Sequence, residues 1–215
     1  MSSEDYIIRM IRQATAVLAR VIGLKNAGQY QEALQNIDQA LEGLLSRNAD
    51  LVLLLDDNSL YSLLMKDDKL DVEKLELIAD FFREEGDILH LQGHKNASLL
   101  SYIRSLNYYL TVGNHLETSS PAELSQKVES VLQSIGTDNL EANTLWDLYG
   151  HFEKGSDFLR AEGMLMGLAA LAESRADALA ELRNFYLRLL ALNPAELIAG
   201  GLNREQIQQK LNDLA

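Results

Sequence analysis

Gly28-Gln29-Tyr30-Gln31-Glu32-Ala33-Leu34-Gln35-Asn36-Ile37-Asp38-Gln39-Ala40-Leu41 carries the clearest structural pattern in this chain. Glycine tolerates the left-handed backbone in which many helices end, and the small residues that follow let a second helix pack closely against the first. A weaker copy of this pattern begins at Gly93, 65 residues further on, and a fragmentary copy begins at Gly155, after another 62 residues. Recurrence at a regular interval predicts a chain built from repeated helical hairpins.

Helical periodicity extends from this stretch in both directions. An apolar stripe between Tyr6 and Ile22 predicts a first helix over residues 4–26. A second helix is expected on the stripe from Ala33 to Leu44, antiparallel to the first because the connection between them is short. Caps and apolar stripes predict later helices over residues 71–92, 97–110, 120–136, 140–153, 158–173 and 174–189, and two short ones beginning at Asn193 and Asn203.

Residues 47–70 are less regular. The apolar run Leu51–Leu55 fits either a buried strand or a helical turn, and we interpret it as a short helix because no second strand candidate lies nearby. Another short helix is expected over Ser59–Met65. Since no low-complexity segment interrupts the series, we predict one helical-repeat domain over residues 1–215, with residues 193–215 as a C-terminal helical cap.

Composition narrows the classes of partner. The formal net charge is −13 and the Lys and Arg residues are scattered, so neither a nucleic acid nor an anionic membrane surface is an expected partner. The sequence contains no run of about 18 apolar residues, so no membrane-spanning helix is expected. Glu4 and Asp5 precede the first apolar run, which is the wrong order for a secretory signal. We expect a cytoplasmic protein that needs no cofactor.

The hairpins resemble the tetratricopeptide repeat, a helix–turn–helix unit of about 34 residues. In the first hairpin, the turn and second-helix positions of that repeat are occupied by Gly28, Tyr30, Ala33, Ile37 and Ala40. The second hairpin matches at Phe82, Gly86, Gly93, Tyr102 and Leu106, and the third at Trp146, Gly150 and, after a one-residue deletion, Phe158 and Ala161. The pattern fails where Val17, Arg20, Lys95 and Ser98 replace its usual residues.

The resemblance implies an all-α fold of stacked antiparallel helical hairpins, a tetratricopeptide-like α-solenoid. Such arrays serve mainly as binding surfaces, so we expect a module for protein–protein interaction or scaffolding. The chain as a whole, opening on Asp5-Tyr6-Ile7-x-Arg9-Met10-Ile11, is also similar to an uncharacterised family of bacterial proteins with tetratricopeptide-like helices. That likeness implies a bacterial origin and no known activity.

Seven side chains are expected to face the concave groove of such an array: Lys25, Arg83, Asp87, His90, Asp147, His151 and Lys154. Chaperone-binding members of the repeat family grip a carboxylate with several Lys, Arg and Asn residues. Asp87 and Asp147 interrupt any such cluster in this chain. We therefore do not expect this protein to bind the carboxylate ligand of those family members. The expected partner is another protein or peptide of unknown identity. The chain could also form a homo-oligomer through its first helix, where Ile7, Met10 and Ile11 offer apolar surface.

The alternative function is a small helical enzyme or metal-dependent hydrolase using His90, His151 and neighbouring carboxylates. His90 and His94 have the spacing of two helical metal ligands, but Leu91 stands where a zinc protease has Glu. The sequence contains neither a phosphate-binding loop nor a Gly-x-Ser-x-Gly elbow. We therefore expect no catalysis.

Two further expectations concern the middle of the chain. Glu84, Glu85 and Asp87 crowd one helical turn and are interpreted as solvated surface charges, offset by Arg83 and Lys95. Among the aromatic residues that follow, Tyr102 is expected in the core with its hydroxyl paired. One of the adjacent Tyr108 and Tyr109 is expected to be exposed as an interface anchor.

Overall fold

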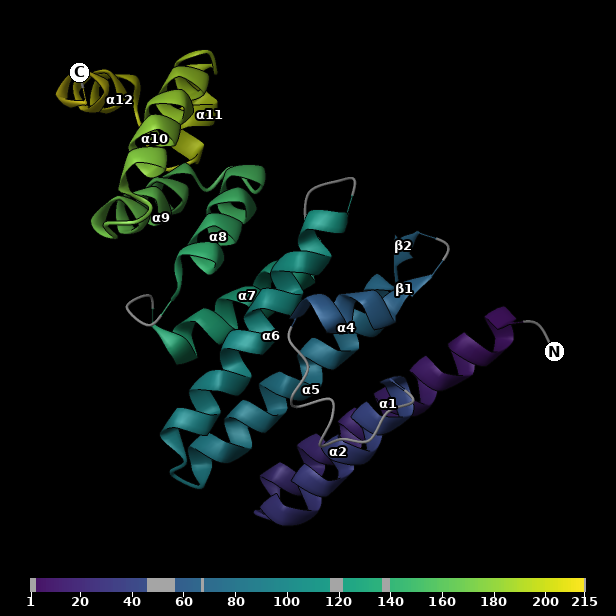
Figure 1. The fold of residues 1–215 in the computed structure, drawn as a ribbon. Coiled ribbons are helices and arrows are strands. Elements are labelled where there is room, and N and C mark those ends of the chain that lie inside the picture. Colours follow the sequence, from purple (N-terminus) through teal and green to yellow (C-terminus); the bar gives the residue numbers. More distant parts are fainter. Residues whose placement is uncertain (1–2, 46–56, 67, 117–121, 137–139, 215) are drawn as a thin grey trace. The chain divides into compact units, whose positions relative to one another are not determined.

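A computed structural model describes residues 3–45, 57–66, 68–116, 122–136 and 140–214. Within these ranges the chain forms eleven α-helices and one two-stranded hairpin, so the protein is all-α, and helices adjacent in the chain pack antiparallel (Figure 1). The helix expected at Leu51–Leu55 and the first two residues of the helix expected over residues 120–136 lie outside the described residues. No described helix is long and apolar enough to cross a membrane.

The chain divides into two compact units. The first comprises Met1–His115 with Gln126–Ile135, and the second comprises Leu116–Ser125 with Gly136–Ala215. Each unit is described by itself below. The single domain expected from the sequence, with its C-terminal cap, stays a prediction.

The first unit contains two long helical hairpins. Helices α1 (Ser3–Asn26) and α2 (Tyr30–Leu45) form one, and α5 (Val72–Leu91) and α6 (Lys95–His115) form the other. Helix α5 packs against α1, α2 and α6, which joins the two hairpins. The described α7 (Ala122–Ile135) belongs to this unit from Gln126 onward. The fully buried side chains of this unit include Val21, Ile37, Leu75, Ile78, Phe81 and Leu106.

A short element precedes the second hairpin. Helix α4 (Asp57–Leu64) confirms the short helix expected over Ser59–Met65. It is followed by strands β1 (Met65–Lys66) and β2 (Lys69–Leu70), which pair antiparallel, with Asp68 in the left-handed region at φ 60°. Strands of two residues are too short to produce an alternating apolar pattern, so no sequence signal predicts them.

The expectation that Tyr108 or Tyr109 is exposed is wrong, because both are buried. Tyr109 donates its hydroxyl to Asp80 of α5 at 2.6 Å, and the Lys127 amine of α7 lies 5.6 Å from the centre of its ring. Tyr108 packs edge-on against Tyr61 of α4, with ring centres 6.1 Å apart. Helix α6 is thus covered on several sides, which a single amphipathic stripe does not reveal.

The second unit consists of α8 (Ala142–Lys154), α9 (Phe158–Ala170), α10 (Arg175–Leu190), α11 (Pro194–Ala199) and α12 (Arg204–Asp213). The two short helices begin at Asn193 and Asn203 as expected, and each of these residues forms a capping box, at the starts of α11 and α12. The C-terminal helices pack onto the preceding ones: the Leu159 amide donates to the Gly200 carbonyl at 3.0 Å, and Gly200 lies against the Phe158 ring.

The same turn joins the helices of three hairpins. Each turn contains one residue with a positive φ angle: Gly28 at 74°, Gly93 at 82° and Ser156 at 60°. In each turn, this residue's amide donates three residues back and the next amide donates five residues back, as in Gly28 to Lys25 and Gln29 to Leu24. Gly155, which the sequence suggested for the third turn, has φ −80°. The left-handed position has moved to Ser156, and this shift accounts for the one-residue deletion in the sequence alignment.

Candidate functional site

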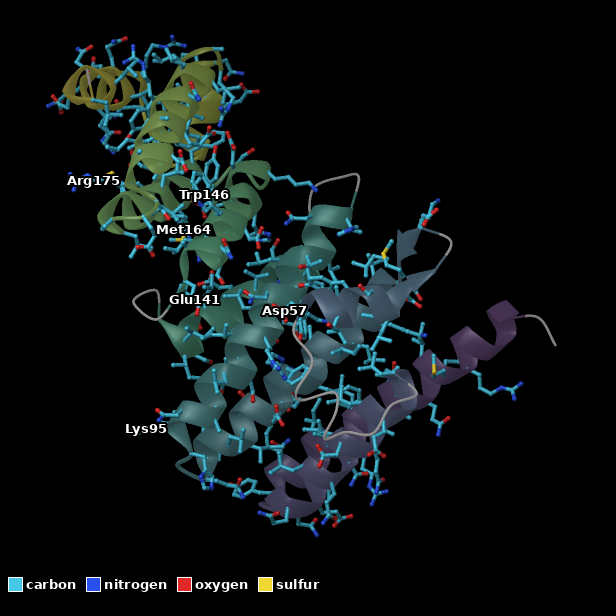
Figure 2. The ribbon with its side chains drawn as sticks, viewed as in Figure 1. Asp57, Lys95, Glu141, Trp146, Met164 and Arg175 are labelled. Carbon is cyan, nitrogen blue, oxygen red and sulfur yellow. The ribbon has the colours of Figure 1, made fainter. Side chains whose placement is uncertain are left out.

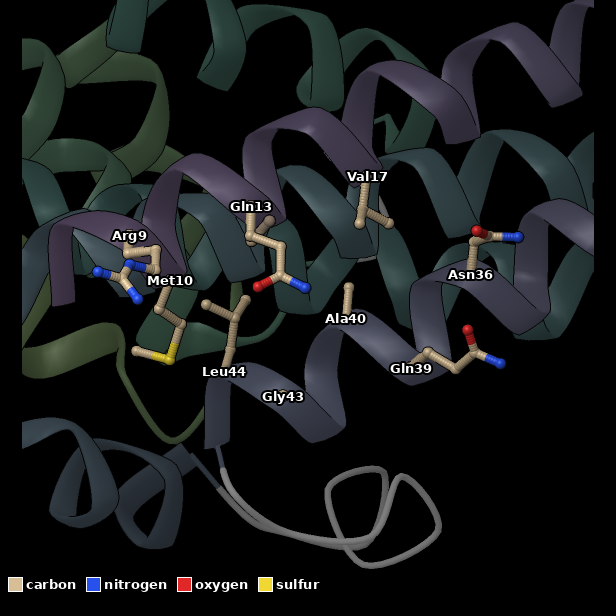
Figure 3. Close-up of a pocket in the computed structure, with 10 residues that line it drawn as sticks. Arg9, Met10, Gln13, Val17, Asn36, Gln39, Ala40, Gly43 and Leu44 are labelled. Carbon is tan, nitrogen blue, oxygen red and sulfur yellow. The ribbon is translucent and has the colours of Figure 1, made fainter. Parts of the chain in front are cut away.

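A groove of about 330 Å³ lies between α1 and α2 in the first unit (Figure 3). Its floor contains Ala14 and Val17 from α1 and Ala40 and Leu44 from α2. Ala14, Ala40 and Leu44 are buried, and Val17 is half-buried. The groove therefore offers an apolar floor that remains open to the surface.

Small residues keep this groove open. Ala14 on α1 and Ala40 on α2 both line the groove, and neither side chain extends beyond its Cβ. Gly43 on the next turn of α2 is exposed, and an added Cβ there would have open space. Because the antiparallel hairpin holds α1 and α2 side by side, this deficit of side-chain volume produces an elongated groove that runs along both helices.

The rim of the groove is polar. Gln13 on α1 and Gln39 on α2 are exposed amides, and Arg9 is an exposed cation. Asn36 donates its side-chain N–H to the Glu32 carbonyl at 2.7 Å, which fixes the orientation of its amide. An apolar floor with amides along its edges can bury apolar side chains of a ligand while hydrogen-bonding its polar groups.

None of the seven side chains expected from the sequence lines this groove. Three of them, Lys25, Arg83 and Asp87, meet in a different place, between α1 and α5. The Lys25 Nζ lies 2.6 Å from both Glu84 Oε2 and Asp87 Oδ2. The expectation that these residues also contact a partner protein stays a prediction.

Glu84 is the centre of this cluster, with a side chain only 1% exposed. Its second oxygen lies 2.5 Å from Arg83 Nη2, so one buried carboxylate has two cationic partners. Burial alone would lower the pKa of Lys25, but the bonds to Asp87 and Glu84 outweigh it and raise that pKa. The interpretation of Glu84 as a solvated surface charge is therefore wrong.

The cluster continues to α6. Tyr102 is buried, as expected, and its hydroxyl donates to Asp87 Oδ1 at 2.8 Å. Burial, together with this carboxylate, raises the pKa of Tyr102 to about 12. Lys95 is exposed at the start of α6 (Figure 2), and the expectation that its charge offsets the carboxylates stays a prediction.

The remaining expected residues are dispersed. His90 is exposed in the last turn of α5, and Gly93 ends the helix before His94, as the sequence suggested. In the second unit, Asp147, His151 and Lys154 lie on α8. Burial, followed by the charges of Arg160 and Lys154, lowers the pKa of His151. Among the described residues there is no group of three or more His, Asp or Glu side chains that could hold a metal ion.

Sequence reasoning missed most of the residues that line the groove. The sequence indicates surplus apolar surface at Met10 but does not indicate which residues of α2 lie beside it. Ala40 predicts close packing between helices, which is the usual role of alanine in such hairpins. One local sequence signal for the groove is present: the small residues Ala40 and Gly43 lie on the same side of α2 as the polar residues Asn36 and Gln39.

The whole chain, residues 1–215, matches the model of a family of unknown function, DUF6483, and the protein belongs to that family. No curated protein and no solved structure matches the chain.

Proposed function

We propose that this member of the DUF6483 family is a protein–protein interaction module that binds a helix of its partner in the groove between α1 and α2. The observation that carries the proposal is the combination of a buried apolar floor and an exposed amide rim along two antiparallel helices. An amphipathic helix fits such a site, because its apolar residues at intervals of three and four face the floor while its flanks meet the rim.

The chemistry of the lining favours binding over catalysis. Among the described residues that line the groove, Arg9 is the only charged one, and the others are aliphatic, amide, thioether or glycine. General acid–base catalysis uses His, carboxylate, Lys, Tyr or Cys groups positioned at the substrate. No observation on the described residues favours the alternative of a small helical enzyme using His90 and His151.

Tetratricopeptide-like stacking is part of the same proposal. Three hairpins with one turn geometry, and the packing of α5 against both helices of the first hairpin, support it. Such stacking presents helix surfaces side by side, which is how helical repeats bind other proteins.

The test compares two glycine substitutions in the full-length chain. Gly43 is exposed in the groove, and Gly163 is exposed on α9 of the second unit; an added Cβ has open space at both. Gly43→Phe places an aromatic ring over the groove, whereas Gly163→Phe makes the same change elsewhere. Both variants should unfold at or above the wild-type temperature, since each replaces a helical glycine.

The measurement is co-purification from the native host of bound protein, including a differently tagged copy of this chain. The dissociation constant of each recovered protein is then determined with the purified components. We expect Gly43→Phe to weaken binding at least tenfold and Gly163→Phe to leave it unchanged. Equal binding by the wild type and both variants would contradict the groove as the binding site.

A further inference from the structure

Helix α9 of the second unit is apolar on both of its sides. Its inner side packs against α8 and α10 and consists of buried apolar residues: Phe158, Ala161, Leu165 and Leu168. Its outer side is open to solvent, although Arg160 and Glu162 are the only charged residues in the sequence of the helix and Glu162 is buried. A helix that is apolar all round is normally covered all round. Within the described part of the chain, one face of α9 is therefore left without the cover that its sequence indicates.

This exposed face of α9 has the spacing of a coiled-coil seam. Its exposed residues follow one another at intervals of four, three and four: Leu159, Gly163, Met166 and Ala170. Leu159 is 52% exposed and Met166 is 55% exposed, so both large side chains lie mainly in solvent. Steps of three and four place residues along one side of a helix, in the pattern by which a second helix packs onto the first. The outer face of α9 therefore fits another helix.

Large and small residues alternate along this seam, which makes it complementary in size to itself. If a second copy of α9 packs antiparallel across a two-fold axis between Met164 and Leu165, Leu159 faces Ala170 of the other copy. Met166 then faces Gly163 of the other copy, where an added Cβ would meet no atom within 4 Å. Every layer of the contact combines one large and one small side chain, as closely packed helices require. A parallel pair would instead place methionine opposite methionine and glycine opposite glycine.

The charge of the chain also favours this face for contact between two copies. The formal net charge is −13, so two copies repel each other over most approaches. The four residues of the seam are uncharged, and Arg160 beside them lies over the ring of Phe152, 4.1 Å from its centre. Two copies can therefore meet along α9 without placing carboxylates of the seam against each other.

From the exposed seam, its alternating side-chain sizes and its lack of charge, we infer that α9 is a self-association surface that packs antiparallel against α9 of a second copy of this chain. This contact is independent of the groove between α1 and α2, and it differs from the contact through the first helix that the sequence suggested. The 13 residues of α9 span about 20 Å at 1.5 Å per residue. Such a pair buries less than the roughly 1,200 Å² of a standard interface, so a dissociation constant in the micromolar range is expected.

An exchange of side-chain sizes tests the pairing. Gly163→Met places methionine opposite methionine in both central layers, and Met166→Ala removes the large side chain from both. Each variant alone should dimerise at least tenfold more weakly than the wild type. An equimolar mixture of the two should form a heterodimer, because each central layer again combines one methionine with one small residue. The double variant Gly163→Met/Met166→Ala should recover the homodimer for the same reason.

Sedimentation equilibrium at protein concentrations from about 1 to 200 μM gives the dissociation constants, and native mass spectrometry identifies the heterodimer. The control is Leu187→Ala, which removes a side chain that is 51% exposed on α10 and should leave dimerisation unchanged. Circular dichroism of both single variants should match that of the wild type, since both positions are exposed. A wild type that stays monomeric throughout, a dimer that neither substitution weakens, or a mixture that associates no better than the single variants would overturn the inference.

The two phenylalanine variants keep this inference apart from the proposed function. Gly163→Phe fills the position that receives Met166 of the other copy, so it should release a second copy while the partner of the groove stays bound. Gly43→Phe should release the partner of the groove and leave the dimer intact. A second copy that Gly43→Phe releases and Gly163→Phe retains would place the contact in the groove and exclude α9.

Discussion

Single buried charges have a defined structural role in the first unit. The Glu84 side chain is almost inaccessible to solvent. Its negative charge is tolerated there because Lys25 of α1 and its neighbour Arg83 supply positive charge at hydrogen-bonding distance. A buried pair of this kind adds little net stability compared with apolar packing. Removing one member is costly, however, because it leaves the other charges desolvated and unpaired. Glu84 thus ties α5 to α1 in a specific register.

We predict that Glu84→Gln lowers the free energy of unfolding by about 3 kcal/mol, because the half-buried Arg83 loses its carboxylate partner and the half-buried Lys25 keeps only Asp87. Urea unfolding at pH 7 followed by circular dichroism measures the difference. The control is Glu32→Gln, which removes the partner of Arg20 in an exposed pair and should change stability by less than about 1 kcal/mol. Equal effects of the two substitutions would mean that Glu84 is solvated in solution.

Glu85, the neighbour of Glu84, should make stability depend on pH. Burial raises its pKa; the Ser101 hydroxyl, which donates at 2.8 Å, opposes this, and the charge of Asp38 adds to it. A raised folded-state pKa means that the ionised carboxylate opposes folding. This unfavourable contribution is fully present above the folded-state pKa, and it vanishes as pH falls below the unfolded value of about 4.3.

Glu85→Gln keeps an acceptor for Ser101 and removes the charge, so it should stabilise the protein at pH 7. The gain over the wild type should shrink as pH is lowered and disappear below about pH 4. Unfolding free energies of both proteins at a series of pH values test the sign. A gain that stays constant with pH would show that its cause is not ionisation.

At the level of elements, the three equivalent turns differ in how well their residues suit the backbone. Gly28 and Gly93 adopt positive φ without a steric penalty, whereas Ser156 has a Cβ in the same conformation. Five residues after each of these positions stands a small, buried side chain: Ala33, Ser98 or Ala161. The hairpins thus share both the turn and the close packing that follows it.

We predict that Ser156→Gly stabilises the protein by about 1 kcal/mol, because it relieves the left-handed strain of the third turn. Gly93→Ala, which introduces that strain into the second turn, should destabilise it by about 1 kcal/mol. Thermal unfolding of the two variants and the wild type provides the comparison. Changes of the same sign in both variants would contradict an equivalent role for the two positions.

Sequence patterns predicted the helices well because amphipathic stripes and caps are local. Asp71 caps α5 by accepting from the Lys74 amide at 3.1 Å, as its position before the stripe suggested. The Lys25–Glu84 contact was not predictable in this way, since it joins residues from different hairpins. The groove was missed because it arises from side-chain volume that is lacking at Ala14 and Ala40, and alanine in a helix ordinarily signals close packing.

On the scale of the whole molecule, the two compact units have separate cores. In the first, Leu106 is fully buried; in the second, Phe185 is fully buried and packs edge-on against Tyr149, with ring centres 5.9 Å apart. The C-terminal helices complete the second core: Leu197 and Ile207 are both inaccessible to solvent. Each unit therefore buries its own apolar surface, which is the physical requirement for a cooperative folding unit.

We predict that the two units open independently, because each is stabilised by its own core. Phe185→Ala should cost roughly 3–5 kcal/mol and Leu106→Ala roughly 2–5 kcal/mol, since both create cavities at fully buried positions. Native-state hydrogen exchange of the full chain, resolved by peptide, locates the effect. Phe185→Ala should reduce protection in residues 140–214 and leave α5 and α6 as protected as in the wild type, and Leu106→Ala should do the reverse. Loss of protection throughout the chain in both variants would instead indicate one cooperative domain, as the uninterrupted helical series in the sequence suggests.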